Sequence, residues 1–214
     1  MNAKGDIRGL YRIAVLAACF AATALLVGGV ALAVSGGATT ASADQRLAAI
    51  DQNLLAFTVG SVAILLVSLL DMFTVPGLVA ALWKDSRVLT GMAAISAVVG
   101  DLLGVTGGLI QAALIPMSQA PAGAGASVQT VILLEGSFSA AGFLLVGVSF
   151  LFFGFSILRG TFGKWLGWVA IAAGVLSILG QVPALAMLFM LASLAYLLWY
   201  IGVATRLNRL AKNA

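Results

Sequence analysis

Histidine is absent from this chain of 214 residues, and cysteine occurs only once, at Cys19 within the first long apolar run. Without histidine, the chain cannot form a His-ligated haem, a histidine-containing zinc site, or a Ser-His-Asp or Cys-His catalytic group. A single cysteine also excludes an intrachain disulfide and a metal site built from several cysteines. We therefore expect no catalytic residues, no metal and no cofactor, and we predict that the protein is not an enzyme.

Charged residues are scarce as well. They make up 8% of the chain, against 62% hydrophobic residues, and the mean hydropathy is +1.15. These values indicate an integral membrane protein rather than a soluble one. The formal net charge of +4 does not indicate nucleic acid, because the basic residues lie in short tails and turns between apolar runs. The expected partner is the lipid bilayer, with a homo-oligomer or a membrane protein partner as alternatives.

Long apolar runs separated by short polar segments predict an all-α fold, a polytopic membrane helix bundle with six transmembrane helices. We place the spans in a single transmembrane domain, 1–214, at about 12–34, 54–82, 88–115, 128–158, 165–181 and 184–204. The last two come from one apolar run of about 40 residues, which is twice the length that a bilayer accommodates. The sequence Gly180-Gln181-Val182-Pro183 interrupts this run and indicates a tight turn.

The first apolar run has a second interpretation. It follows a basic amino-terminal stretch and precedes Ala41-Ser42-Ala43, which resembles the small-residue cleavage site of a secretory signal peptide. However, a run of about 22 apolar residues is longer than the core of such a signal and long enough to span a bilayer. We therefore predict that the first helix is retained.

Three local signals predict where helices begin, bend or end. Asp44 is the expected N-cap of a helical segment that leads into the second span. Pro76 predicts a kink within that span. Pro116 predicts the end of the third span, followed by an uncharged loop over 117–127.

The distribution of basic residues predicts the orientation. With six spans and the amino terminus inside, ten of the eleven lysines and arginines lie on the inner side, and only Arg46 lies outside. Cytoplasmic loops carry an excess of basic residues, so we predict that the N- and C-termini are both cytoplasmic. Four tryptophans fall at the same boundary, where indole rings anchor helices: Trp83, Trp165, Trp168 and Trp199.

Two acidic residues, Asp71 and Asp101, lie inside consecutive spans. Each is about 13 to 15 residues from the polar turn that joins these spans, so both lie roughly 20 Å from the same face, near the bilayer midplane. A charged carboxylate there costs on the order of 3 kcal/mol, and neither span contains a basic residue to pair with it. The alternatives are a neutral acid, a shared proton, a bound cation, or hydrogen bonds from Ser61 and Ser68.

We therefore predict an ion- or proton-binding site formed by Asp71, Asp101 and Ser68. Gln111 and Glu135 both lie about 24 residues from the inner end of their helices, and we predict that they line the outer approach to this site. Two plainer interpretations remain open. Each aspartate can be a protonated packing residue, and Glu135 can be an interfacial carboxylate in contact with water.

Small residues recur at every fourth position of the third span, at Ser96, Gly100, Gly104 and Gly108. This spacing lets two transmembrane helices approach each other closely. The pattern therefore predicts a helix-packing seam beside Asp101.

Three hypotheses about function follow from these residues. The first is a small proton- or cation-coupled transporter or channel that uses Asp71 and Asp101. The second is a non-catalytic membrane subunit or assembly protein whose acids pair with a basic group of a partner. The third and least favoured is an intramembrane enzyme. The acid pair resembles that of intramembrane aspartyl proteases, but Leu70 and Val98 stand where that family's Tyr-Asp and Gly-x-Gly-Asp motifs have tyrosine and glycine.

The segment 162–174, FGKWLGWVAIAAG, resembles the start of the fifth helix in a family of uncharacterised bacterial membrane proteins of about this length, catalogued as a domain of unknown function. The opening motif Arg8-Gly9-Leu10-Tyr11 and the six-span plan are also similar to that family. The resemblance implies a six-helix, multi-pass protein of the bacterial inner membrane without an assigned activity. It carries over no functional residues.

Overall fold

The computed structural model describes residues 3–35, 42–119, 125–160, 162–185 and 187–214. Within these ranges the chain is helical and contains no strand, so the predicted all-α fold is confirmed. The elements are α1 (Ala3–Ser35), α2 (Ala43–Gln52), α3 (Leu54–Leu82), α4 (Arg87–Ser118), α5 (Gly125–Arg159), α6 (Lys164–Leu179), the 3-10 helix Pro183–Leu185, and α7 (Met187–Asn213).

Five of the described helices are long and apolar enough to cross a membrane: α1, α3, α4, α5 and α7. They support a multi-pass membrane protein. The helix α6 is apolar but has only 16 residues, so it is about 24 Å long, against a hydrocarbon core of about 30 Å. The predicted count of six spans therefore depends on α6 and stays a prediction.

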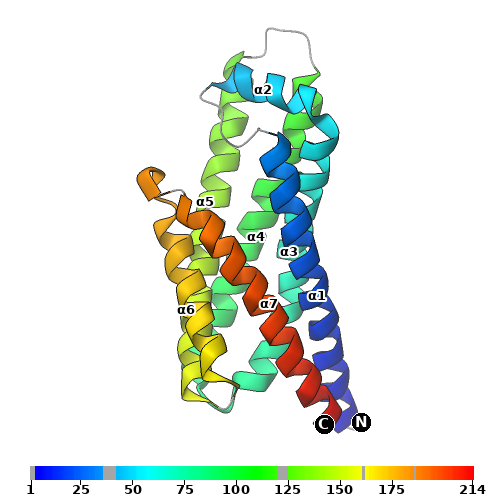
Figure 1. The fold of residues 1–214 in the computed structure, drawn as a ribbon, viewed down its shortest axis with the longest axis vertical. Helices are drawn as coiled ribbons and strands as arrows, with labels where there is room; N and C mark the ends of the chain where they lie inside the picture. The colour runs from blue at the N-terminus through cyan, green and yellow to red at the C-terminus, as the bar shows by residue number, and fades with distance from the viewer. Residues whose placement is uncertain (1–2, 36–41, 120–124, 161, 186) are drawn as a thin grey trace.

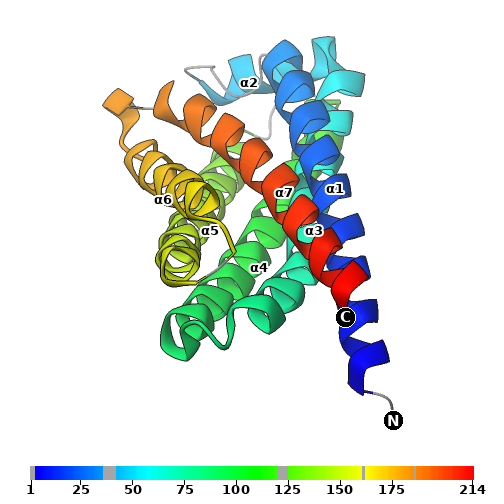
Figure 2. The ribbon, with the colours of Figure 1, turned by 60° about the horizontal axis from the view of Figure 1, so that its bottom comes forward.

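The long helices form a closed ring. The helix α1 packs against α3 and α7, and the remaining contacts follow the chain from α3 to α4, α5, α6 and back to α7. Both termini lie at one end, together with the α3–α4 and α5–α6 turns, whereas α2 lies across the opposite end (Figures 1 and 2). Side chains that point into this ring are consequently shielded from the surroundings of the bundle.

The position of Trp199 differs from the one predicted. This residue was expected to be an interfacial anchor, but it is 1% exposed and packs inside the ring against Phe150 and Phe153. The reason is the position of the last helix, which continues to Asn213 instead of ending near residue 204. Trp199 therefore lies in the middle of α7 rather than at its end.

Other helix limits also differ from the predictions. Ser42, not Asp44, caps α2, because its side chain accepts a hydrogen bond from the backbone N–H of Gln45 at 3.2 Å. The helix α3 continues through Pro76, and the kink predicted at that position stays a prediction. The helix α4 likewise passes Pro116, since a proline in a helix removes a backbone hydrogen bond without necessarily ending the helix. Part of the predicted loop, 120–124, lies outside the described residues.

Candidate ion- or proton-binding site

A contact between α3 and α4 fixes the depth of the two aspartates. A Cβ atom on Gly104 would lie 2.8 Å from Oγ of Ser68, so these two residues are level with each other. The two helices run in opposite directions, joined by the turn after Leu82. Asp71 and Asp101 each lie three residues from this contact toward that turn, which is about 4.5 Å for both. The aspartates therefore lie at the same depth.

Both carboxyl groups are inside the ring. Asp71 is 4% exposed and Asp101 is 3% exposed, and the two groups are close enough for their charges to interact. One oxygen of each, Asp71 Oδ1 and Asp101 Oδ2, has no hydrogen-bond partner, and neither acid forms an ion pair within the described ranges. Two negative charges this close in an apolar interior repel each other strongly. At least one proton or cation is needed to relieve this repulsion.

An aromatic cluster from α5 and α7 lies beside the acids. The hydroxyl of Tyr200 lies near the carboxyl group of Asp71. Tyr200 contacts Trp199, with ring centroids 5.4 Å apart, and Phe150 contacts both Trp199 and Tyr196 at 4.5 Å. We call Phe150, Phe153, Tyr196, Trp199 and Tyr200 the aromatic cluster.

The aromatic cluster carries two further polar atoms without a hydrogen-bond partner, Oη of Tyr196 and Nε1 of Trp199. Buried tyrosine and tryptophan normally find a partner for these groups. Together with the two carboxyl oxygens, four unpartnered buried polar atoms lie on residues whose side chains face the same interior. This concentration marks the region as a polar site within an otherwise apolar core.

The predicted serine donors are placed differently from one another. Ser61 is buried, but its hydroxyl donates to the backbone oxygen of Phe57 at 2.8 Å and not to an aspartate. Ser68 is half-buried and lies against Gly104, one turn of α3 beyond Asp71. Ser61 is therefore satisfied by its own helix, while Ser68 stays at the edge of the site.

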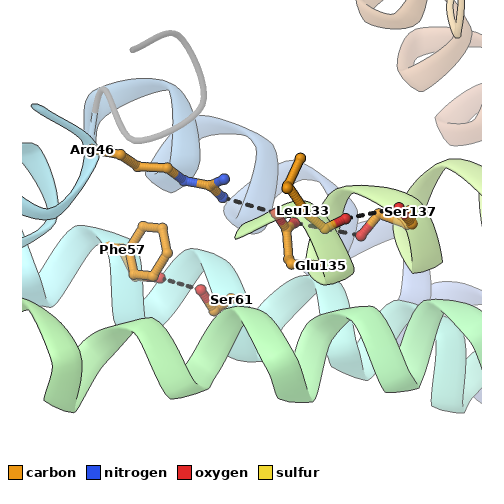
Figure 3. A network of polar contacts seen from close by, with 7 residues as sticks. Arg46, Phe57, Ser61, Leu133, Glu135 and Ser137 are labelled. Atoms are coloured by element: carbon orange, nitrogen blue, oxygen red, sulfur yellow. Dashed lines mark hydrogen bonds and ion pairs between the residues drawn. The ribbon is translucent and has the colours of Figure 1, made fainter. Parts of the chain in front are cut away.

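Gln111 and Glu135 lie farther toward the outer end. Gln111 is buried, ten residues or about 15 Å along α4 from Asp101. Glu135 forms an ion pair with Arg46 of α2 at 3.1 Å and accepts a hydrogen bond from Ser139 at 3.4 Å (Figure 3). Glu135 is therefore paired with Arg46 rather than with the aspartates. This ion pair links α2 to α5 across the end of the bundle.

The glycines of α4 contact two helices of the same chain. A Cβ on Gly100 would lie 2.9 Å from the backbone nitrogen of Val146 in α5, and one on Gly108 would lie 3.1 Å from Leu65 in α3. On α5, a Cβ on Gly142 would lie 3.0 Å from backbone atoms of Gly100 and Gly104. Ser96 is half-buried. The close approach of α3, α4 and α5 holds the helices that carry the two aspartates.

The available ligand atoms are oxygens. Two carboxyl groups and the hydroxyl of Tyr200 provide the hard donors that protons and hard metal cations prefer. Within the described residues there is no group of three or more histidine, cysteine, aspartate or glutamate side chains that could hold a metal ion. The arrangement offers two carboxyl groups and one hydroxyl to a bound proton or cation.

Sequence reasoning missed the contribution of α7 to this site. Trp199 and Tyr200 follow Tyr196 by three and four residues, which places them on one helical face with it. That spacing was a usable signal. It was obscured because the surrounding run is apolar throughout, so no polar face distinguishes the inner side of α7.

No family model matches the chain. No curated protein matches it, and no solved structure matches it. The resemblance to a family of uncharacterised bacterial membrane proteins is therefore still a prediction, and the roles of the residues above are argued from their geometry alone.

Proposed function

We propose that this protein is a small transporter or channel coupled to protons or to a monovalent cation, and that Asp71 and Asp101 bind the coupling ion. The observation that carries this proposal is the burial of two neighbouring carboxyl groups at one depth, without a basic partner in the described part of the chain. Intramembrane acids are costly, and they usually mark ion pathways or proton relays.

The membrane setting belongs to the same proposal. We place the protein in the bacterial inner membrane with six spans, counting α6, and with both termini in the cytoplasm. The common end of the termini and of the α3–α4 and α5–α6 turns is compatible with this orientation (Figure 1). A short α6 is accommodated if the bilayer thins locally around it.

Two layers of the structure separate the acid pair from the surroundings of the bundle. On the outer side, α2 lies across the end of the ring and is held by the ion pair between Arg46 and Glu135. Within the ring, the aromatic cluster packs beside Asp71. Transport would require at least one of these layers to move, and the neutralised pair is the state in which such a movement costs least.

Flux measurements in proteoliposomes test the proposal. The purified chain is expected to carry a current or a pH change that depends on a proton or Na⁺ gradient, and the Asp71→Asn, Asp101→Asn double variant is expected to lose it. Asp51→Asn is the matched control, because Asp51 is an exposed aspartate on α2. Unchanged flux in a folded double variant would remove the proposal.

A second candidate is a non-catalytic membrane subunit or assembly protein. An open groove between α1 and α7 favours it. Small side chains line part of this groove, among them Ala22, Thr23, Ala204 and Thr205, beside larger apolar ones such as Leu26 and Ile201. Small residues allow helices to dock. A partner that copurifies in a fixed ratio, together with no flux from the purified chain, would support this alternative. An enzymatic role remains the least favoured hypothesis.

A further inference from the structure

Basic side chains gather where the first turns of α1 meet the last turns of α7. A Cβ on Gly77 would overlap Ala14 of α1 and touch Leu207 of α7, so these positions are level with each other. The two helices run in opposite directions (Figure 2). The residues before Ala14 therefore lie beside the residues after Leu207. The first segment carries Lys4, Arg8 and Arg12, and the second carries Arg209 and Lys212, with Arg206 directly before Leu207. The side chains described by the structure are those of Arg8, Arg12, Arg206, Arg209 and Lys212.

Tryptophans place this end of the bundle at the membrane boundary. Trp165 and Trp168, at the start of α6, are 52% and 63% exposed, as expected of indoles at the headgroup level. Trp165 packs on α7, because a Cβ on Gly202 would lie 2.8 Å from its ring. Arg206 lies one turn beyond Gly202, and Lys212 lies about 9 Å farther along the helix. The basic residues of α7 therefore lie at and just outside the headgroup level.

The charge at this end is not neutralised by the chain itself. None of the five basic residues forms an ion pair within the described ranges, and Asp6 is the only acid on these two segments. The opposite face of the last turns of α7 is apolar and docked, with Leu207 at 0% and Ala211 at 3% exposure. Arg209 and Lys212 consequently face outward.

We propose that Arg8, Arg12, Arg206, Arg209 and Lys212 form a surface that binds the headgroups of anionic phospholipids. A cluster of basic residues beside a membrane helix attracts anionic lipids, by about fivefold for each charge near the surface. Arg8, Arg12, Arg209 and Lys212 are exposed, whereas Arg206 is half-buried with its guanidinium group against Gly163 of the α5–α6 turn. The surface has the sign and the depth that this contact requires. The inference does not depend on ion transport by the aspartates.

Native mass spectrometry of the full-length protein tests this proposal. The protein is released from micelles that contain equal amounts of phosphatidylglycerol and phosphatidylcholine. Wild type is expected to retain phosphatidylglycerol at least about fivefold more than phosphatidylcholine. The variant with Arg206→Gln, Arg209→Gln and Lys212→Gln is expected to lose this preference, and added salt is expected to weaken it in wild type.

Two controls keep the result specific. The variant with Lys84→Gln, Arg87→Gln and Arg159→Gln loses the same charge from exposed positions in the other two turns of this end, and it should keep the preference. Arg206→Lys with Arg209→Lys should keep it too, which separates a loss of charge from a loss of fold. Equal losses in both glutamine variants, or displacement of the lipid by inorganic phosphate at similar concentrations, would overturn the proposal.

Discussion

At the scale of single residues, the surroundings of Asp71 and Asp101 differ in one respect. Asp71 has a hydroxyl group within reach, that of Tyr200, whereas no side-chain donor to Asp101 is found within the described ranges. A hydrogen bond to the charged form of an acid favours that form. The two aspartates are therefore not equivalent, and Tyr200 is the residue that distinguishes their surroundings.

Tyr200→Phe tests the contact with Asp71. Removing the hydroxyl leaves a buried carboxyl without its donor, so we expect a loss of about 1 to 3 kcal/mol in unfolding free energy. The measurement is reversible unfolding in mixed detergent micelles. Tyr196→Phe is the matched control, because the Tyr196 hydroxyl lies near Ser177 rather than beside an aspartate, and its removal should cost less than about 1 kcal/mol. Equal losses in the two variants would contradict this account of Tyr200.

The sequence was sufficient to predict that the two aspartates are level with each other, but not to predict which side chains surround them. Depth follows from counting residues along two helices that share a turn, which holds whatever packs around them. Whether a hydroxyl reaches an acid depends on helix rotation and on competing acceptors. The Ser61 hydroxyl donates to the backbone oxygen of Phe57 in its own helix. Tyr200, in contrast, belongs to a helix that lies more than 100 residues later in the chain than Asp71.

At the scale of helices, α4 and α5 pack so closely that their backbones are in contact at Gly142. A Cβ there would lie 3.0 Å from backbone atoms, which cannot move aside as a flexible side chain can. We expect Gly142→Ala to push the two helices apart and to lower the unfolding free energy by about 1 to 3 kcal/mol.

Gly136→Ala provides the comparison on the same helix. A Cβ on Gly136 would meet nothing within 4 Å, so alanine should be neutral or should stabilise α5 by up to about 1 kcal/mol through its higher helix propensity. Both variants are measured by the same unfolding assay. A Gly142→Ala protein as stable as Gly136→Ala would show that the α4–α5 contact is looser than described.

Helix limits were predictable only where polar residues interrupt the apolar runs. The turn after Leu82 was placed correctly because Lys84, Asp85 and Arg87 follow it. The last two helices were harder, since apolar residues continue on both sides of the turn near Pro183 and the helix extends past residue 204 into basic sequence. Because of that error, Trp199 was predicted at the helix end, whereas the structure places it in the core.

At the scale of the whole molecule, the topology depends on whether α6 spans the membrane. A spanning α6 puts the α6–α7 turn on the side opposite the α3–α4 turn. Val182 is exposed in the α6–α7 turn, and Lys84 is exposed in the α3–α4 turn. In a Cys19→Ser background, we expect a membrane-impermeant maleimide to label Val182→Cys in intact cells. Lys84→Cys should be labelled only after the membrane is opened. Labelling of both positions from the same side would leave five spans.

The most direct measurement on the acid pair is infrared difference spectroscopy of the reconstituted protein, recorded while the pH is stepped and while Na⁺ is added. Carboxyl groups that gain a proton or a cation change their stretching bands. We therefore expect wild type to show bands that persist in Asp51→Asn and are missing from the Asp71→Asn, Asp101→Asn variant, in addition to the bands of the remaining carboxyl groups. A double variant whose spectra match those of wild type under both treatments would contradict ion binding by Asp71 and Asp101.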